Sequence, residues 1–239
     1  MKALVLTFHD ISDHDHVLSY PIDAFEHLLQ EFGRHNVPVV DFDTLRRGGG
    51  GVTLTFDDGF ASVHRVALPA LRARGYPAHL FAATGSIGRA ERWPVGAARP
   101  DHLAMLDWQQ LEDCHHGGVT IEAHTVDHPD LCTLDRDAIV DQCQRANETI
   151  AARLGRAPRL FAYPFGRFNT HVVRAAAPLY SACFTTRMGY WMAGSDSARV
   201  PRIDSYYLRS RWLRQNLLGT GADLYLRMRG LVRQILGRT

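Results

Sequence analysis

The sequence predicts an α/β barrel with a parallel sheet. Short apolar runs, typical of buried strands, alternate along the chain with longer segments whose apolar residues recur every three or four positions, as in amphipathic helices. About seven strand–helix pairs follow one another, and this alternation favours parallel strands that can close into a barrel. Polar residues directly follow several predicted strands, and the carboxyl ends of barrel strands form the rim on which active sites are built.

The strands are predicted from the apolar runs in chain order. They cover residues 3–8, 52–56, 78–83, 119–123, 160–163, 181–185 and 200–203. The first run is too short for the apolar region of a secretory signal, and no small-residue cleavage site follows it. We therefore expect it to be the first strand of a cytoplasmic protein. The glycine run 48–51 predicts a turn, and the non-periodic stretch 85–100 predicts a loop.

The helices are predicted from apolar residues that share one face. They cover residues 22–34, 62–74, 107–116 and 134–154. The first carries Phe25, Leu28, Leu29 and Phe32 on one face, and the last keeps the same spacing with Ile139, Cys143, Ala146, Ile150 and Leu154. Gly155, directly after this last helix, is a candidate C-terminal cap.

Composition indicates a globular chain with one large domain. Of 239 residues, 46% are hydrophobic and 22% are charged, which suffices to bury a substantial core. No stretch approaches the ~20 apolar residues of a bilayer-spanning helix. Four cysteines, at positions 114, 132, 143 and 183, lack Cys-x-x-Cys spacing and are expected to be reduced thiols. Residues 1–208 are predicted to form the barrel domain, and residues 209–239 a basic amphipathic helical extension.

The end of the chain is strongly basic. From Arg199 to Thr239 there are nine arginines and two aspartates, a net charge of +7 within an overall charge of +2. A helix predicted over 222–236 places Leu224, Met228, Leu231 and Ile235 on one face, near Arg227, Arg229 and Arg233. We expect this helix to dock on the barrel, and the alternative is that it lies on an anionic membrane surface.

Two aspartates end the second predicted strand, in the segment Thr55-Phe56-Asp57-Asp58-Gly59. Neighbouring side chains of a strand point to opposite faces, but a turn at Gly59 can aim both carboxylates into one cavity, with different roles. The simpler interpretation is a turn whose carboxylates accept hydrogen bonds from backbone N–H groups. The pair indicates one metal ligand and one catalytic base only in combination with other motifs.

Two histidines follow the predicted strand 119–123, in the segment His124-Thr125-Val126-Asp127-His128. On a helix this spacing would put both rings on one face, but Pro129 disfavours helical geometry at His128, so we predict a turn. Two imidazoles and one carboxylate provide three protein ligands for a divalent metal and leave positions open for water and substrate. The alternative is two surface histidines among the 13 in the chain.

These segments resemble the polysaccharide deacetylase family, which is carbohydrate esterase family 4 with its NodB-homology domain. The matching motifs are Thr-Phe-Asp-Asp-Gly at 55–59, His-Thr-x-x-His-Pro-x-Leu at 124–131 and Phe-Ala-Tyr-Pro-Phe-Gly at 161–166. The resemblance runs from about Ala3 to Asp204. It implies a distorted (β/α)7 barrel and a hydrolase that removes N-acetyl, sometimes O-acetyl, groups from sugars with one divalent metal ion.

The resemblance also implies a role for each matched residue. Asp58, His124 and His128 would be the metal ligands, and the metal would most often be Zn2+. Asp57 would be the general base that takes a proton from the metal-bound water as it attacks the acetyl carbonyl. A site with two histidines and one aspartate also accepts Co2+, Ni2+ or Mn2+.

The motif Tyr163-Pro164-Phe165 is expected to line the substrate site. By resemblance, the backbone N–H of Phe165 donates to the oxyanion that develops on the acetyl group. Many family members carry an arginine two residues before the motif proline, where this chain has Ala162. A subgroup of the family shares the Ala-Tyr-Pro sequence, so loss of activity does not follow.

A second departure concerns the general acid. Many members carry a late histidine that protonates the leaving amine, but no histidine follows His171 in this chain. We predict that His9, at the end of the first strand, fills or supports this role, and the alternative is that it only hydrogen-bonds within the rim. Asp204 and Tyr163 are the fallback candidates, and Arg202 could hold a carboxylate or polarise the substrate.

The predicted function is metal-dependent removal of N-acetyl groups from a saccharide or polysaccharide precursor. The alternatives are an amidase acting on a small non-sugar C–N substrate and a catalytically silent carbohydrate-binding homologue. Trp93, Tyr190 and Trp191 could stack on sugar rings or belong to lids and core edges. No nucleic-acid partner is predicted, and the sequence leaves the oligomeric state open.

Overall fold

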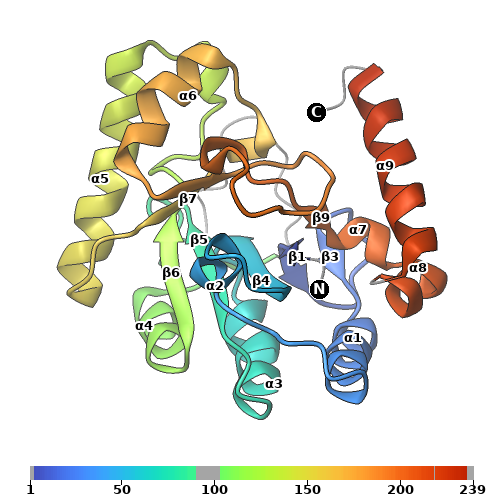
Figure 1. Cartoon of the computed structure of the whole chain (residues 1–239). Coiled ribbons are helices and arrows are strands. Elements are labelled where there is room, and N and C mark those ends of the chain that lie inside the picture. The colour runs from blue at the N-terminus through green and yellow to red at the C-terminus, as the bar shows by residue number, and fades with distance from the viewer. Residues whose placement is uncertain (1–2, 90–102, 218, 236–239) are drawn as a thin grey trace.

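The computed structural model describes residues 3–89, 103–217 and 219–235. Within these residues a sheet of seven parallel strands curls through the centre of the molecule, with helices around it (Figure 1). The strands are β1 (Ala3–Phe8), β4 (Gly51–Asp58), β5 (Ala78–Ala82), β6 (Val119–Ala123), β7 (Leu160–Ala162), β8 (Ala182–Phe184) and β9 (Ile203–Asp204). Their order across the sheet is β8–β7–β6–β5–β4–β1–β9. The prediction of a parallel α/β barrel is confirmed.

The two edges of this sheet meet through the backbone of Val200. Val200 forms an isolated parallel bridge with Phe184 of β8, three residues before β9 begins at Ile203. The strand predicted at 200–203 is therefore split between the two edges. Between its halves, the backbone N–H of Arg202 donates to the carbonyl of Arg187 at 2.9 Å. The barrel is thus closed by a few irregular contacts, at the place where Arg202 enters the interior.

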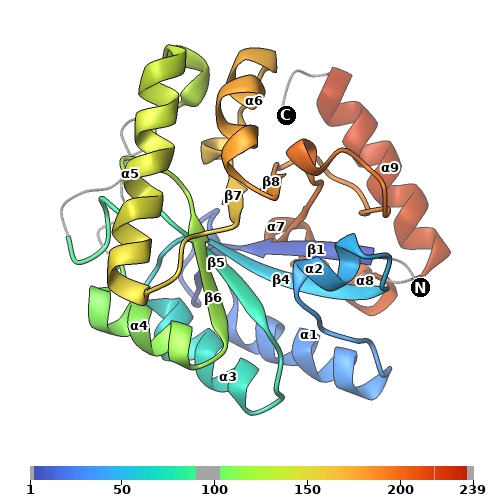
Figure 2. The ribbon, with the colours of Figure 1, turned by 60° about the vertical axis from the view of Figure 1, so that its left-hand side comes forward.

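Nine α-helices occur in the part of the chain that the structure describes. They are α1 (Ile22–Arg34), α2 (Phe42–Arg46), α3 (Leu68–Arg72), α4 (Trp108–His116), α5 (Arg136–Leu154), α6 (Thr170–Ala176), α7 (Ser205–Leu208), α8 (Arg211–Asn216) and α9 (Thr220–Ile235). Figure 2 shows α3 and α4 on one side of the sheet and α8 and α9 near the amino terminus of β1. Two short strands, β2 (Asp10–Ile11) and β3 (Ser19–Tyr20), pair separately.

Local signals account for the helix ends. Asp107 accepts a hydrogen bond from the backbone of Gln110, whose side chain accepts one from the backbone of Asp107, so α4 begins with a capping box. Asp135 caps α5 by accepting from the backbone N–H of Ala138. Gly155 adopts φ 67° after α5, and its prediction as the C-terminal cap is confirmed.

The barrel interior is filled partly by residues from outside the sheet. Helix α2, which the sequence did not predict, inserts Phe42 between Phe184, at 4.7 Å between ring centroids, and Trp191, at 5.2 Å. Trp191 is only 3% exposed and its indole N–H donates to the carbonyl of Leu45, so it belongs to the core and not to a sugar-stacking surface. The hydroxyl of Tyr190 donates to the carbonyl of Leu217. Trp93 lies outside the described residues.

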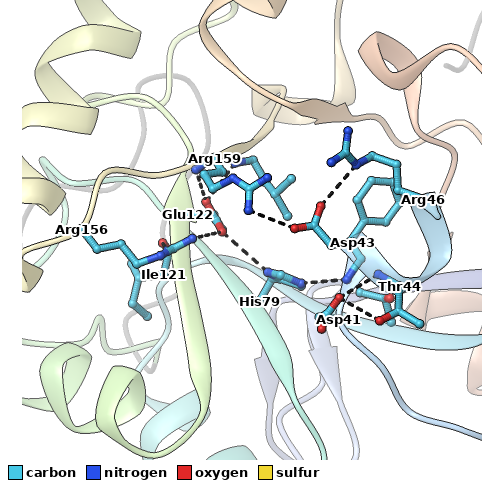
Figure 3. Close-up of polar contacts among 12 residues, drawn as sticks. Asp41, Asp43, Thr44, Arg46, His79, Ile121, Glu122, Arg156 and Arg159 are labelled. Atoms are coloured by element: carbon cyan, nitrogen blue, oxygen red, sulfur yellow. Dashed lines mark hydrogen bonds and ion pairs between the residues drawn. The ribbon is translucent and has the colours of Figure 1, made fainter.

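A polar network connects strands β5 and β6 to α2 (Figure 3). Glu122 of β6 is 1% exposed and accepts hydrogen bonds from the backbone N–H of Leu160 at 2.9 Å and from Arg156 at 3.1 Å. His79 of β5 lies 3.8 Å from the Glu122 carboxylate and accepts a hydrogen bond at its Nε2 from the backbone N–H of Phe42. Because that N–H is one of the unpaired donors at the start of α2, His79 fixes α2 to the barrel.

Helix α9 packs on the barrel through the side opposite to its predicted apolar stripe. Ala222 and Leu226 are fully buried, whereas Leu224 and Met228 are 63% and 61% exposed. The predicted apolar stripe, as far as Leu224 and Met228 represent it, therefore does not face the barrel. None of the described helices is both long enough and apolar enough to cross a bilayer.

Candidate active site

Three candidate metal ligands converge at the carboxyl rim of the sheet. His124 Nε2 and His128 Nε2 lie 3.0 Å apart, and each is 3.3 Å from Asp58 Oδ1. All three side chains are buried. Among the described residues, this is the one group of three or more His, Cys, Asp or Glu side chains whose ligand atoms gather closely enough to hold a metal ion.

Strand register brings these residues together. Asp58 of β4 pairs with Ala82 of β5, and Ala82 pairs with Ala123 of β6, so His124 emerges two strands away from Asp58 at the same level. The intervening β5 ends at Ala82 and is followed by Ala83, and these small residues leave room for the carboxylate and the imidazole to approach each other. The carboxyl ends of parallel strands therefore assemble the site, as the sequence predicts.

Backbone strain is concentrated around this cluster. Five non-glycine residues among those described have positive φ, and four of them surround the site: Asp58 at 73°, Thr125 at 66°, His128 at 52° and Phe165 at 57°. Such conformations cost free energy and persist where the surrounding structure imposes them, often at functional sites. The left-handed conformation of Asp58 also explains how two consecutive aspartates can serve one cavity.

The donor set fits a divalent metal ion. Ligands at 2.0–2.1 Å from a tetrahedral metal lie roughly 3.3 Å from one another, which matches the separations of the three donor atoms. His124 Nδ1 lies 2.7 Å from the carbonyl of Ala162, so its proton points there and its Nε2 lone pair faces the cluster. Burial, only partly opposed by Asp58, lowers the pKa of His128 to about 4, which keeps that imidazole neutral and able to bind a metal.

The loop between the two histidines is held by helix α5. Gln142 Oε1 accepts hydrogen bonds from the backbone N–H groups of Val126 and Asp127, both at 3.0 Å, and its amide group donates to Asp127 at 2.9 Å. The backbone N–H of His128 donates to the hydroxyl of Thr125 at 3.0 Å. These bonds fix the turn that the sequence predicted from Pro129, but nothing in the sequence pointed to Gln142.

Asp57 faces Arg202 in a bidentate ion pair. Both guanidinium NH2 groups donate to the carboxylate, one to each oxygen at 2.7 Å, and the Arg202 side chain is fully buried. Arg202 also donates to the carbonyl of Thr185 at 3.0 Å and lies 5.6 Å above the ring of Phe81. Burial alone would raise the pKa of Asp57, but the Arg202 guanidinium outweighs it and holds that pKa below its usual range.

Arg202, and not the alanine at position 162, therefore supplies the cation that pairs with Asp57. Ala162 contributes its backbone carbonyl to His124, while the cation beside Asp57 comes from the chain just before β9. The sequence predicts that Arg202 holds a carboxylate or polarises the substrate. It could not assign the carboxylate, because the two residues are 145 positions apart.

Phe165 lies beside the candidate metal ligands. Its ring is 39% exposed, and its centroid lies 4.4 Å from that of the His128 ring. The following Gly166 has φ +65°, and a Cβ there would lie 2.1 Å from Thr186 Oγ1. Only glycine fits this turn without displacing the Thr186 side chain, so the backbone around Phe165 is tightly fixed.

The remaining candidate residues occupy different positions. His9 directly follows Phe8, whose Cα pairs with that of Phe56, and after Arg202 and His124 it is among the groups that lower the pKa of Asp57. Asp204 caps α7 by accepting from the backbone of Tyr206 at 2.7 Å. Tyr163 and Pro164 are buried, and the Tyr163 hydroxyl donates to the carbonyl of Ala198 at 3.0 Å. His9 thus lies near the cluster, whereas the side chains of Asp204 and Tyr163 have structural partners.

Known proteins share this sequence and fold. YxkH of Bacillus subtilis (strain 168), whose name assigns it to the polysaccharide deacetylases, is 27% identical over 139 residues, which are 58% of this chain and 45% of YxkH. The chain thus matches less than half the length of this curated relative. The deacetylase PplD of Streptococcus pyogenes, solved with acetate, superimposes with a TM-score of 0.74 at 25% identity, over 85% of this chain and 92% of PplD.

A second solved structure supports the fold. IcaB from Ammonifex degensii superimposes with a TM-score of 0.77 at 24% identity, over 90% of this chain and 98% of IcaB. The family model described as polysaccharide deacetylase matches residues 45–180, a span that includes Asp57, Asp58 and both histidines of the cluster. More than half of the chain is matched, and the chain therefore belongs to the polysaccharide deacetylase family.

Proposed function

We propose that this protein is a metal-dependent hydrolase that removes N-acetyl groups from a saccharide or a polysaccharide precursor. The observation that carries the proposal is the three-donor cluster of Asp58, His124 and His128 with the ionised Asp57 adjacent in sequence. Similarity to PplD, a deacetylase solved with acetate, supports the same reaction type. A divalent metal held by the cluster, most readily Zn2+, supplies Lewis acidity that lowers the pKa of water towards ~7 and polarises a carbonyl group.

The chain's own residues then divide the work. Asp57 accepts a proton from the attacking water as the new C–O bond forms at the acetyl carbon. The backbone N–H of Phe165 donates a hydrogen bond to the developing oxyanion, for which a fixed backbone is required. The C–N bond then breaks, the amine nitrogen receives a proton, and the products are acetate and a free amine. Arg202 keeps Asp57 ionised until it accepts this proton and holds the carboxyl group in position.

We assign the proton given to the leaving nitrogen to His9. An amine leaves poorly without a proton, whereas para-nitrophenolate needs none. His9→Ala should therefore lower acetate release from N-acetylated sugars by about 10²–10⁴-fold and leave the hydrolysis of para-nitrophenyl acetate nearly unchanged. Equal losses on both substrates, or unchanged turnover on both, would remove His9 from this role.

The reaction itself is tested by acetate release from N-acetylglucosamine oligomers and from small N-acetylated amines. Zinc-loaded protein, chelated protein and Asp57→Asn are compared, and bound metal is measured separately by mass spectrometry. Release from sugars that requires both zinc and Asp57 would support the proposal. Release only from non-sugar amides would favour the amidase alternative. Stoichiometric bound zinc with no release from any substrate would favour a silent binding protein.

A further inference from the structure

An apolar surface is left uncovered where α8 meets α9. We call it the α8–α9 surface and define it by Trp212, Leu224, Tyr225 and Met228, whose exposed fractions are 50%, 63%, 36% and 61%. The rings of Trp212 and Tyr225 pack edge to face, with centroids 6.0 Å apart, so the two helices present one continuous patch. These four are half of the exposed large hydrophobic side chains in the described parts of the chain, yet they fall within 17 residues.

Packing of α9 does not explain this surface. Ala222 and Leu226 are fully buried and already attach the helix to the main core. Leu224 and Met228 are offset from them by two positions, which on an α-helix turns their side chains by about 200° to the opposite side. In the sequence the same apolar spacing continues through positions 231 and 235, beyond the residues whose side chains are described. The stripe is therefore a second apolar face, in addition to the one that folding uses.

Arginines border the apolar patch. Arg229 lies over two rings, with its guanidinium carbon 5.8 Å from the centroid of Tyr225 and 5.6 Å from that of Tyr207. Arg211, the first residue of α8, is exposed next to Trp212. From Ser205 to the last residue the chain carries seven arginines and a single acidic residue, Asp223. The exposed apolar groups thus lie within the most cationic part of the chain.

We propose that the α8–α9 surface docks on the anionic face of a lipid bilayer. Aliphatic and aromatic side chains flanked by arginine are the composition of helices that lie in the membrane interface. Arginine stems can cover apolar surface while their guanidinium groups reach lipid phosphates. A second copy of the same surface would oppose arginine to arginine, which disfavours self-association. Nucleic acid would satisfy the arginines but would leave Leu224 and Met228 exposed to water.

The test is co-sedimentation of the full chain with vesicles of phosphatidylcholine alone or of phosphatidylcholine with phosphatidylglycerol. Binding should require phosphatidylglycerol and should weaken when the salt rises from about 0.1 M to about 1 M. The double variants Leu224→Ser/Met228→Ser and Arg211→Gln/Arg229→Gln should each weaken binding by about tenfold or more. Thermal melting of both variants in the absence of lipid should match wild type, because these side chains are exposed.

A matched control removes equally exposed apolar groups elsewhere. Val17→Ser/Met192→Ser changes side chains that are 61% and 69% exposed and should bind vesicles like wild type. Tryptophan fluorescence should shift to the blue on binding, and Trp212→Phe should abolish that shift. Absence of binding to anionic vesicles, or an equal loss in the control variant, would overturn the proposal. It would also be overturned if Leu224→Ser/Met228→Ser abolished concentration-dependent self-association of a chain that ignores vesicles.

Discussion

Replacing Arg202 tests how the proposed base is held. Arg202→Met keeps much of the side-chain length and apolar contact but removes both hydrogen bonds to Asp57. The Asp57 carboxylate, which is only 4% exposed in the wild type, would then lack its guanidinium partner. Breaking a buried ion pair by removing one partner costs about 3–5 kcal/mol. Since a domain of ordinary stability unfolds at about 5–15 kcal/mol, this single change should consume a large part of the total.

The free-energy cost of breaking the Asp57–Arg202 ion pair can be separated from the cost of losing the other Arg202 contacts. Arg202 also donates to the carbonyl of Thr185 and to the hydroxyl of Thr55, so part of the cost has nothing to do with Asp57. In an Asp57→Asn background the buried Arg202 guanidinium already lacks its counter-charge, and Arg202→Met removes that cation. The same change should therefore cost no more than the loss of neutral hydrogen bonds, about 1–3 kcal/mol. The difference between the two backgrounds measures the coupling of the pair.

The assay is urea unfolding of metal-free wild type, both single variants and the double variant at pH 7. Linear extrapolation gives the four free energies of unfolding, provided that the slopes agree. Arg202→Lys is the conservative comparison, because it keeps the charge but cannot form two parallel hydrogen bonds. The reasoning is refuted if Arg202→Met costs under about 1 kcal/mol, well below the range for a buried pair, or if its cost is the same in the Asp57→Asn background.

Three further outcomes are expected. Burial would raise the pKa of Glu122, but His79, Arg156 and a backbone N–H outweigh it and lower that pKa. The ionised Glu122 therefore stabilises the fold above its unfolded pKa of about 4.3, and this contribution is lost as the pH falls through the lower folded pKa. Glu122→Gln should lower the free energy of unfolding at pH 7 by about 1–3 kcal/mol in urea titrations, and the difference from wild type should disappear in acid. Gln142→Met should weaken zinc affinity by about 10–100-fold in competition titrations, while Gln144→Met on the exposed side of α5 should not. Zinc at 100 times its Kd should stabilise wild type by about 2.7 kcal/mol in thermal melts and should leave His128→Ala unchanged.

Features encoded by local pattern could be predicted from the sequence. The spans of β1, α1 and β6 coincide with the predicted ranges, because each combines an uninterrupted period with a clear stop. Gly155 ends α5 as expected, since only the backbone conformation of the cap is needed. The short motifs around Asp58, His124 and His128 could also be brought to one rim, because parallel strands share the direction of their carboxyl ends.

Features that depend on contacts between distant segments could not be predicted. Helix α2 has five residues and too little length for a period, and its position depends on His79 and on the rings that surround Phe42. The strand predicted at 200–203 is irregular because Val200 pairs with β8 at one edge of the sheet, whereas β9, which begins at Ile203, pairs with β1 at the other. For α9 the sequence correctly indicated an apolar stripe, but periodicity does not tell which face of a helix the rest of the protein covers.

The Asp57–Arg202 pair also links the closure of the barrel to the proposed chemistry. Arg202 enters where the β8 and β9 edges meet, and its guanidinium lies over the ring of Phe81, so the ion pair connects this irregular closure of the sheet to the carboxyl end of β4. A substitution that removes the charge of Asp57 would therefore strand a buried cation as well as remove the proposed base. Asp57→Asn retains one oxygen acceptor for Arg202, whereas Asp57→Ala retains none and leaves a fully buried guanidinium unpaired, at a cost of several kcal/mol. Loss of activity in Asp57→Ala could thus reflect unfolding, and only Asp57→Asn, shown to remain folded, separates the base from the support that it gives to the barrel.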